Sequence, residues 1–124
     1  MIAKHIDFTN QFNTGIGSNT GLLQIDTSGF DYTIVHFINM TGSTTFQGSN
    51  DGGAIQGDTE GNPTSATNWV SVQGVNQTTG AAGTSAASNT IYKFSSVARY
   101  LQFDGTASAT CKGLVYFAKI SQTM

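Results

Sequence analysis

The sequence predicts one all-β domain, an antiparallel β-sandwich with a jelly-roll-like order of strands. Three observations lead to this prediction. Short runs of β-branched and aromatic residues recur along the chain, and many of them alternate apolar with polar residues. Clusters of Gly, Asn and Ser separate these runs, and no long segment has the period and caps of a helix. The 124 residues suit a single domain that spans residues 1–124.

Taken in order along the chain, about eight segments have the length and composition of strands. The segment Asp31–Met40 is the strongest of them, because apolar side chains occupy both of its alternating faces. Such a pattern predicts a central strand that is covered on both sides or lies at an interface. The expected strands are Lys4–Phe8, Gly21–Asp26, Asp31–Met40, Ser43–Ser49, Asn68–Val75, Thr90–Ser95, Ala98–Asp104 and Thr110–Ser121.

Two connections, Asn50–Thr67 and Asn76–Asn89, are longer than hairpin loops usually are. Both consist mainly of small and polar residues and contain no aromatic side chain. Such loops have little with which to pack onto their own domain. We therefore expect both to become ordered only against a neighbouring subunit.

Charge is sparse, since charged residues make up 10% of the chain and the net charge is −2. The basic residues are scattered rather than clustered, which argues against a nucleic-acid partner. No apolar stretch approaches the ~20 residues that span a bilayer, and the N-terminal segment lacks the apolar centre of a signal peptide. We therefore expect that the protein does not associate with a membrane. We expect it to be made and assembled in a cytoplasm. A polar, weakly charged surface suits extensive contact with proteins or with carbohydrate.

Three acidic residues lie close together in the first long connection. Asp51, Asp58 and Glu60 could offer oxygen ligands to calcium, although their spacing does not match the EF-hand loop. The run Asn50–Gly53 favours a turn instead, because Asn, Asp and Gly tolerate positive φ. We expect a turn and no metal, and the sequence leaves the calcium alternative open.

The chain contains two histidines, His5 and His36, and one cysteine, Cys111. Their spacing does not form a zinc site, which takes three or four protein ligands. His36 falls mid-strand between apolar residues, where a hydrogen-bonded structural imidazole is expected. A Cys–His nucleophile pair with Cys111 stays open, but neither G-x-S-x-G nor a phosphate-binding Gly-rich loop occurs in the sequence. We expect no catalytic, cofactor-binding or metal-ligating residues and no enzymatic activity.

Trp69 has two interpretations. It begins a strand directly after a long connection and has Asn68 beside it, which is the composition of a sugar site on a sandwich. Tryptophan also supplies a large buried area in cores. We expect Trp69 to be a core residue and keep the sugar platform as the alternative.

The segment Phe46–Gly53 reads F-Q-G-S-N-D-G-G, and three further segments follow it: Trp69–Val72, Arg99–Phe103 and the apolar strand Gly113–Ile120. This series resembles small β-sandwich virion proteins of tailed bacteriophages, and the resemblance covers roughly residues 34–120. The chain departs from the family pattern in the long connection between Gly53 and Trp69. No catalytic residues come with the resemblance.

The resemblance implies a bacteriophage virion structural protein, namely a capsid decoration protein, a head-fibre component or a tail or baseplate component. The expected partners are further copies of the chain, with a trimer as the favoured count, and capsid or tail proteins. The expected location is the virion, after assembly in the host cytoplasm. The alternative is a carbohydrate-binding module or receptor-binding tip, whose partner would be a host-surface glycan.

Overall fold

The computed structural model describes residues 2–11, 22–27, 29–51, 68–95, 98–106 and 111–121. Within these ranges all regular structure is β, which confirms the predicted all-β sandwich. The same ranges hold no helix long and apolar enough to cross a membrane. The strands are β1 (Ile2–Gln11), β2 (Leu22–Asp26), β3 (Tyr32–Ile38), β4 (Thr44–Ser49), β5 (Val70–Ser71), β6 (Gly74–Asn76), β7 (Ala82–Gly83), β8 (Ser85–Ala86), β9 (Thr90–Ser95), β10 (Tyr100–Gly105) and β11 (Lys112–Ser121).

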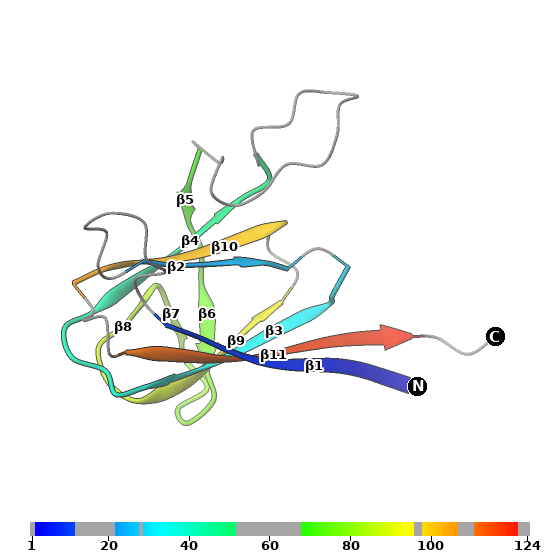
Figure 1. Ribbon diagram of the computed structural model, residues 1–124, viewed down its shortest axis with the longest axis horizontal. Coiled ribbons are helices and arrows are strands. Elements are labelled where there is room, and N and C mark those ends of the chain that lie inside the picture. The colour runs from blue at the N-terminus through cyan, green and yellow to red at the C-terminus, as the bar shows by residue number, and fades with distance from the viewer. Residues whose placement is uncertain are drawn as a thin grey trace.

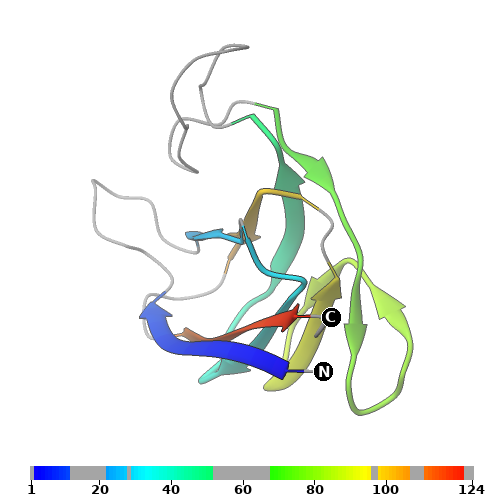
Figure 2. The ribbon, with the colours of Figure 1, turned by 90° about the vertical axis from the view of Figure 1, so that its right-hand side faces the viewer.

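The strands form two packed antiparallel sheets, seen as two layers in Figure 1. The six-stranded sheet has the order β1-β11-β3-β9-β6-β7, and the five-stranded sheet has the order β2-β10-β4-β5 with β8 also paired to β4. Pairing is nested, since β1 pairs with β11, β2 with β10, β3 with β9 and β4 with β5. Successive pairs alternate between the sheets, as a long hairpin does when it is rolled up. This is the jelly-roll order, and Figure 2 shows the roll from its side.

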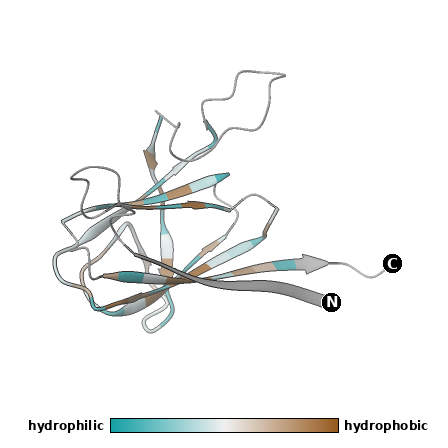
Figure 3. Cartoon of the chain, in the orientation of Figure 1, coloured by the Kyte–Doolittle hydropathy of each residue, from teal (hydrophilic) through white to brown (hydrophobic). Residues whose placement is uncertain are grey.

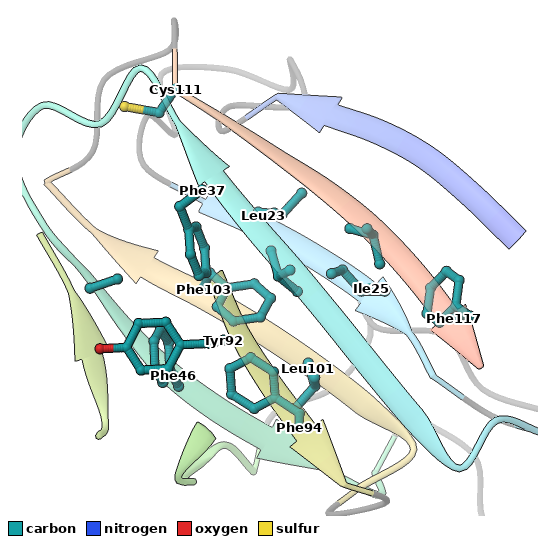
Figure 4. Packing of buried hydrophobic residues seen from close by; sticks show 13 residues of the cluster. Leu23, Ile25, Phe37, Phe46, Tyr92, Phe94, Leu101, Phe103, Cys111 and Phe117 are labelled. Atoms are coloured by element: carbon teal, nitrogen blue, oxygen red, sulfur yellow. The ribbon is translucent and has the colours of Figure 1, made fainter. Parts of the chain in front are cut away.

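The hydrophobic core lies between the sheets and is rich in aromatic rings (Figure 4). Phe46 of β4 is fully buried, and its ring centroid lies 4.9 Å from that of Tyr92 and 5.0 Å from that of Phe94. Phe103 of β10 lies 5.6 Å from Phe46 and 5.3 Å from Phe37. Most of these pairs are edge-on, the arrangement that aromatic quadrupoles favour. The core therefore joins both sheets through one connected aromatic cluster.

Strand β3 lies between β11 and β9, so the prediction of a central strand is confirmed. Thr33, Val35 and Phe37 point into the core and are buried. Ile34 and Ile38 on the other side are half-buried. Hydrophobic residues thus stand on both sides of β3, and Figure 3 shows hydrophobic and hydrophilic residues mixed along the strands of both sheets.

The prediction of one strand over Asn68–Val75 is wrong. The chain forms β5 in the five-stranded sheet, crosses over at Val72 and Gln73, and forms β6 in the six-stranded sheet. The amide of Val72 donates to the carbonyl of Phe46 (3.0 Å), and the Val72 side chain packs against the core. The alternating pattern is real, but its residues serve two sheets.

The prediction that Asn76–Asn89 is a loop that orders only against another subunit is also wrong. Its first half is the turn and return strand of the β6–β7 hairpin, with the Asn76 side chain accepting from the amide of Thr78 (2.8 Å). Its second half crosses back as β8, where Thr84 accepts a hydrogen bond from the Phe46 amide (2.8 Å) and Ala86 is buried. Gly83 and Ala86 are small where the chain passes close to the core, since a Cβ at Gly83 would lie 3.4 Å from the Tyr92 hydroxyl oxygen and Ala86 is buried. Residues 52–67 of the other long connection lie outside the described part.

Candidate interaction surfaces

The outer side of the six-stranded sheet carries apolar side chains on four neighbouring strands, interrupted by two lysines and a histidine, and is here called the apolar face. On β3, Ile34 pairs with Tyr116 of β11 on one side and with Lys93 of β9 on the other, so the face runs across strands. Val75 and Ile91 are 41% and 36% exposed, and the other large members are half-buried. The apolar face consists of Tyr32, Ile34, Ile38, Val75, Ile91, Leu114, Tyr116 and Ala118.

Two lysines and one histidine also stand on the apolar face. Lys93, Lys112 and His36 alternate with the apolar residues of their strands. The Lys93 ammonium lies 4.1 Å above the centroid of the Tyr32 ring, a cation–π contact that holds it over this face. The apolar face is therefore hydrophobic, with two lysine ammonium groups among its described side chains.

His36 differs from its sequence interpretation. Its imidazole is exposed at the middle of the apolar face, with Leu114 and Ile91 as its cross-strand neighbours. His36 shares a face with Ile34 and Ile38, as expected, but its exposure argues against the expected structural role, because the alternation of β3 turns Val35 and Phe37 inward and His36 outward. His5 lies in β1, and its side chain is outside the described ones.

The outer side of the five-stranded sheet is polar and is here called the amide face. Gln24, Gln102 and Gln47 stand in register on β2, β10 and β4. The Gln24 amide donates to the Gln102 carbonyl oxygen (2.7 Å), and the Gln102 amide donates to that of Gln47 (2.9 Å). Gln102 is 7% exposed, so this ladder satisfies a nearly buried amide. Our sequence reasoning missed the ladder, although each glutamine occupies the middle of its apolar strand.

Two carboxylates and one tyrosine complete the amide face. Asp26 and Asp104 are exposed. Tyr100 pairs with Asp26 and Ser49, is fully buried, and has the Arg99 guanidinium carbon 5.0 Å from its ring centroid. Its hydroxyl is buried and has no hydrogen-bond partner within the part of the chain that the structure describes. The described ionisable side chains of this face are therefore acidic, apart from Arg99 at the start of β10.

A polar cluster lies at the end of the sandwich where β4 ends. The side-chain amide of Asn68 donates to the Asp51 carboxylate (2.8 Å), and the Arg99 amide donates to the Asn50 side chain (2.9 Å). The Ser49 hydroxyl accepts from the amide of Asp51 (3.0 Å). These hydrogen bonds agree with the expected turn at Asn50 and Asp51.

The described residues give no support to the alternative of a metal site. Among them, no three His, Cys, Asp or Glu side chains lie close enough together to hold a metal ion. Asp51 is held by Asn68 instead. Asp58 and Glu60 lie outside the described residues. The prediction that no metal binds here remains a prediction.

Trp69 is half-buried and stands outside the hydrophobic core, so its prediction as a core residue is wrong. The physical reason is the crossover. The chain enters the core only at Val72, and Trp69 lies before β5, next to the Asn68–Asp51 hydrogen bond. A half-buried tryptophan that follows Asn68 in the sequence agrees with the composition that the sugar alternative requires.

The Cys111 thiol has a structural role. It is fully buried, donates to the carbonyl of Asn39 (3.0 Å) and accepts from the amide of Thr41 (3.4 Å). Asn39 has φ of 55°, in the left-handed region. The hydrogen bonds of the sulfur therefore stabilise a turn that contains this residue. His36 faces solvent on the apolar face, and the structure gives this thiol and imidazole no contact. The geometry therefore gives no support to a Cys–His nucleophile.

The nested strand pairs define a jelly-roll β-sandwich. The chain shares this fold with a protein of known structure. No family model and no curated protein matches the sequence. The crystal structure of the SPBc2 prophage-derived protein YomS matches the fold with a TM-score of 0.63. The match covers 95% of this chain and 95% of that chain, at 15% sequence identity. The chain therefore shares its whole fold with a protein of prophage origin.

Proposed function

We propose that this chain is a bacteriophage virion structural protein that acts through protein–protein contacts. The observation that carries the proposal is the apolar face, whose half-buried and exposed aliphatic and aromatic side chains span β6, β9, β3 and β11. Apolar side chains that gather on one outer side of a sheet favour a contact with another protein. The role would be that of a capsid decoration protein, a head-fibre component or a tail or baseplate component, with capsid or tail proteins as partners.

The fold match supports the phage part of the proposal. YomS derives from a prophage, and the shared fold extends over nearly all of both chains. Jelly rolls occur in viral capsid domains and in lectins, so the fold alone leaves the function open. The origin of the matched protein favours the viral use.

The segment Phe46–Gly53, which carries the sequence resemblance, has structural roles where it is described. Phe46 is at the centre of the aromatic cluster. A Cβ at Gly48 would lie 2.9 Å from both Val72 and Ala98, so only glycine lets the crossover pass so close. Ser49 and Asn50 hold the following turn. The resemblance therefore rests on residues that build the fold, which suits a structural protein.

The test is the protein content of purified particles. Particles made with and without the gene are purified on density gradients, and their proteins are quantified by mass spectrometry. We expect the chain in a fixed ratio to the major capsid or tail protein, and its return on complementation. A chain that is abundant in the lysate but absent from purified particles would refute the proposal.

A second candidate function is binding of a host-surface glycan. The half-buried Trp69 beside the Asn68–Asp51 hydrogen bond favours it. A glycan array probed with the native protein and with Trp69→Ala tests this candidate. Binding that disappears in the variant while its melting temperature stays nearly constant would support a sugar site, and no binding by the native protein would exclude one for the glycans tested.

A further inference from the structure

We infer that two copies of this chain associate through their apolar faces, about a two-fold axis that runs parallel to the strands between β11 and β3. The inference deepens the proposed structural function, on which it rests, by naming a second copy of the chain as the partner of this face. It depends on one cross-strand row of residues that has an acidic end, an apolar middle and a basic end.

The row crosses the six-stranded sheet from its edge strand β1. Asp7 of β1 is in register with Tyr116 of β11, and Tyr116 is in register with Ile34 of β3. Ile34 is in register with Lys93 of β9, and Lys93 with Val75 of β6. Directly opposite residues of neighbouring strands stand on the same side of a sheet. The whole row therefore belongs to the outer side of this sheet, where the apolar face lies.

The basic end of the row is held over the apolar face. The Lys93 ammonium lies 4.1 Å from the centroid of the Tyr32 ring, and both residues are half-buried. A partner that covers this face takes the ammonium out of water. An ammonium that loses its water without gaining a charged partner is destabilising. The partner surface should therefore place a carboxylate over Lys93.

A second copy of the chain supplies that carboxylate. Rotation by 180° about an axis parallel to the strands, midway between Tyr116 and Ile34, reverses the order of the row and keeps its level along the strands. The rotation places Asp7 of each copy over Lys93 of the other. It also places Tyr116 of each copy over Ile34 of the other. The row is thus complementary to itself, which is what an interface with two-fold symmetry requires.

The other cations of the apolar face do not oppose one another in this arrangement. His36 shares a row with Leu114, so the rotation places it over Leu114 of the second copy. Lys112 shares a row with Ile38 and comes to lie over Ile38 of the second copy. Like charges brought together across an interface select against a contact. Here the apolar side chains can be covered without that cost.

The arrangement also agrees with the way in which β-sheets pack. Sheets that pack face to face keep their strands aligned to within about 30°. An axis parallel to the strands gives such an alignment. The five-stranded sheet lies on the opposite side of the sandwich (Figures 1 and 2), so in the pair both five-stranded sheets face outward. The inferred unit is a dimer, which differs from the trimer favoured in the sequence analysis.

Charge reversal at the two ends of the row tests the inference. Lys93→Glu gives the row two acidic ends and Asp7→Lys gives it two basic ends, so each variant opposes like charges in its own dimer. The matched controls are Lys119→Glu and Asp104→Lys, because both residues are exposed and lie outside the apolar face. Each full-length protein is measured by sedimentation velocity and native mass spectrometry at low and high salt, with circular dichroism as a check of folding.

We expect the native protein and both controls to dimerise equally. Each reversal in the row should raise the dissociation constant of the dimer by about tenfold or more at low salt, and by less at high salt. An equimolar mixture of the two variants should form a heterodimer, because the lysine introduced at position 7 then faces the glutamate introduced at position 93. The chain with both substitutions should dimerise again. Mixing would not repair a folding defect, so the heterodimer separates the inference from one.

Three results would overturn the inference: a native protein that stays monomeric at about 100 µM, a reversal variant that dimerises like the native protein, or two impaired variants whose mixture forms no heterodimer. Each would leave the particle-content test of the proposed function unaffected. Conversely, a chain that is absent from purified particles but whose variants form the heterodimer would refute the virion function and retain the two-fold contact.

Discussion

Strands β3 and β10 lie inside opposite sheets and have the same inner side but different outer sides. Inward, β3 places Val35 and Phe37 in the core, and β10 places Leu101 and Phe103 there. Outward, β3 presents half-buried isoleucines, whereas β10 presents Gln102, which its neighbours hydrogen-bond. The inner sides of both strands stabilise the fold. Of the outer sides, that of β10 also contributes to stability, while that of β3 is the one that we propose for contact with a partner.

The largest expected effect is shared by the two inner sides. Phe37→Ala on β3 and Phe103→Ala on β10 should each lower the free energy of unfolding by about 3–5 kcal/mol, because each leaves a cavity in the aromatic cluster. Chemical denaturation followed by circular dichroism measures this. If one substitution lowers the free energy of unfolding several times more than the other, the inner sides of the two strands are not equivalent.

On the outer sides, Gln102→Leu should lower the free energy of unfolding by about 1–3 kcal/mol. The substitution leaves the amide of Gln24 and the carbonyl of Gln47 without their partner on β10. The matched change on β3, His36→Leu, should stay within about 0.5 kcal/mol of the native protein, since the imidazole is exposed. Equal losses in the two variants would show that the ladder has no special role.

Two glycines of the β6–β7 hairpin, which follows the crossover between the sheets, should differ in their tolerance of a side chain. Gly74→Ala should destabilise the fold by about 1–3 kcal/mol, because the new Cβ would lie 2.6 Å from the buried Phe94 ring. Gly83→Ala in the same hairpin places its Cβ 3.4 Å from the Tyr92 hydroxyl oxygen and should be nearly neutral. Thermal denaturation of both variants gives the difference, and an equal fall in melting temperature would count against tight packing at the crossover.

A small stability effect is expected for Ile34→Thr on the apolar face. The residue is half-buried, so the change should cost about 1 kcal/mol or less in the monomer. Association should weaken far more than folding, because the lost surface belongs to the proposed contact. Unfolding and sedimentation are measured on the same preparation. If association weakens no more than the free energy of unfolding does, the apolar face has no part in assembly.

Much of the fold could be predicted because alternation records which side of a strand is buried. The strands Asp31–Met40 and Thr110–Ser121 were recognised from residues such as Val35 and Val115 that prove to be buried. The segments around Trp69 and Gly80 were misinterpreted for a different reason. There the chain changes sheets at Val72 and again at Thr84, and a change of sheet leaves no periodic signal.

The candidate surfaces were predicted only in part. The two apolar sides of β3 pointed to an interface, and the structure places the outer one beside Leu114, Tyr116 and Ile91. The glutamine ladder required knowledge of register, because Gln24, Gln47 and Gln102 are far apart in the sequence and meet only when β2, β4 and β10 align. Cross-strand neighbours of this kind belong to the topology, which local patterns do not contain.

Nested pairing also determines the order in which pairs of strands can form during folding. During synthesis β1 is made before the other strands of this domain, but its partner β11 is made after all of them, and Ile2 can meet Ser121 only then. Pairing between segments so distant in sequence is slow, in the range of milliseconds to seconds for β-rich domains. The innermost pair, β4 with β5, can form much earlier. We therefore expect the roll to close from its middle outward, so that until β11 has been made β3 lacks the neighbour that completes the apolar face. A surface assembled so late in folding is presented to other copies only by chains that have nearly finished folding.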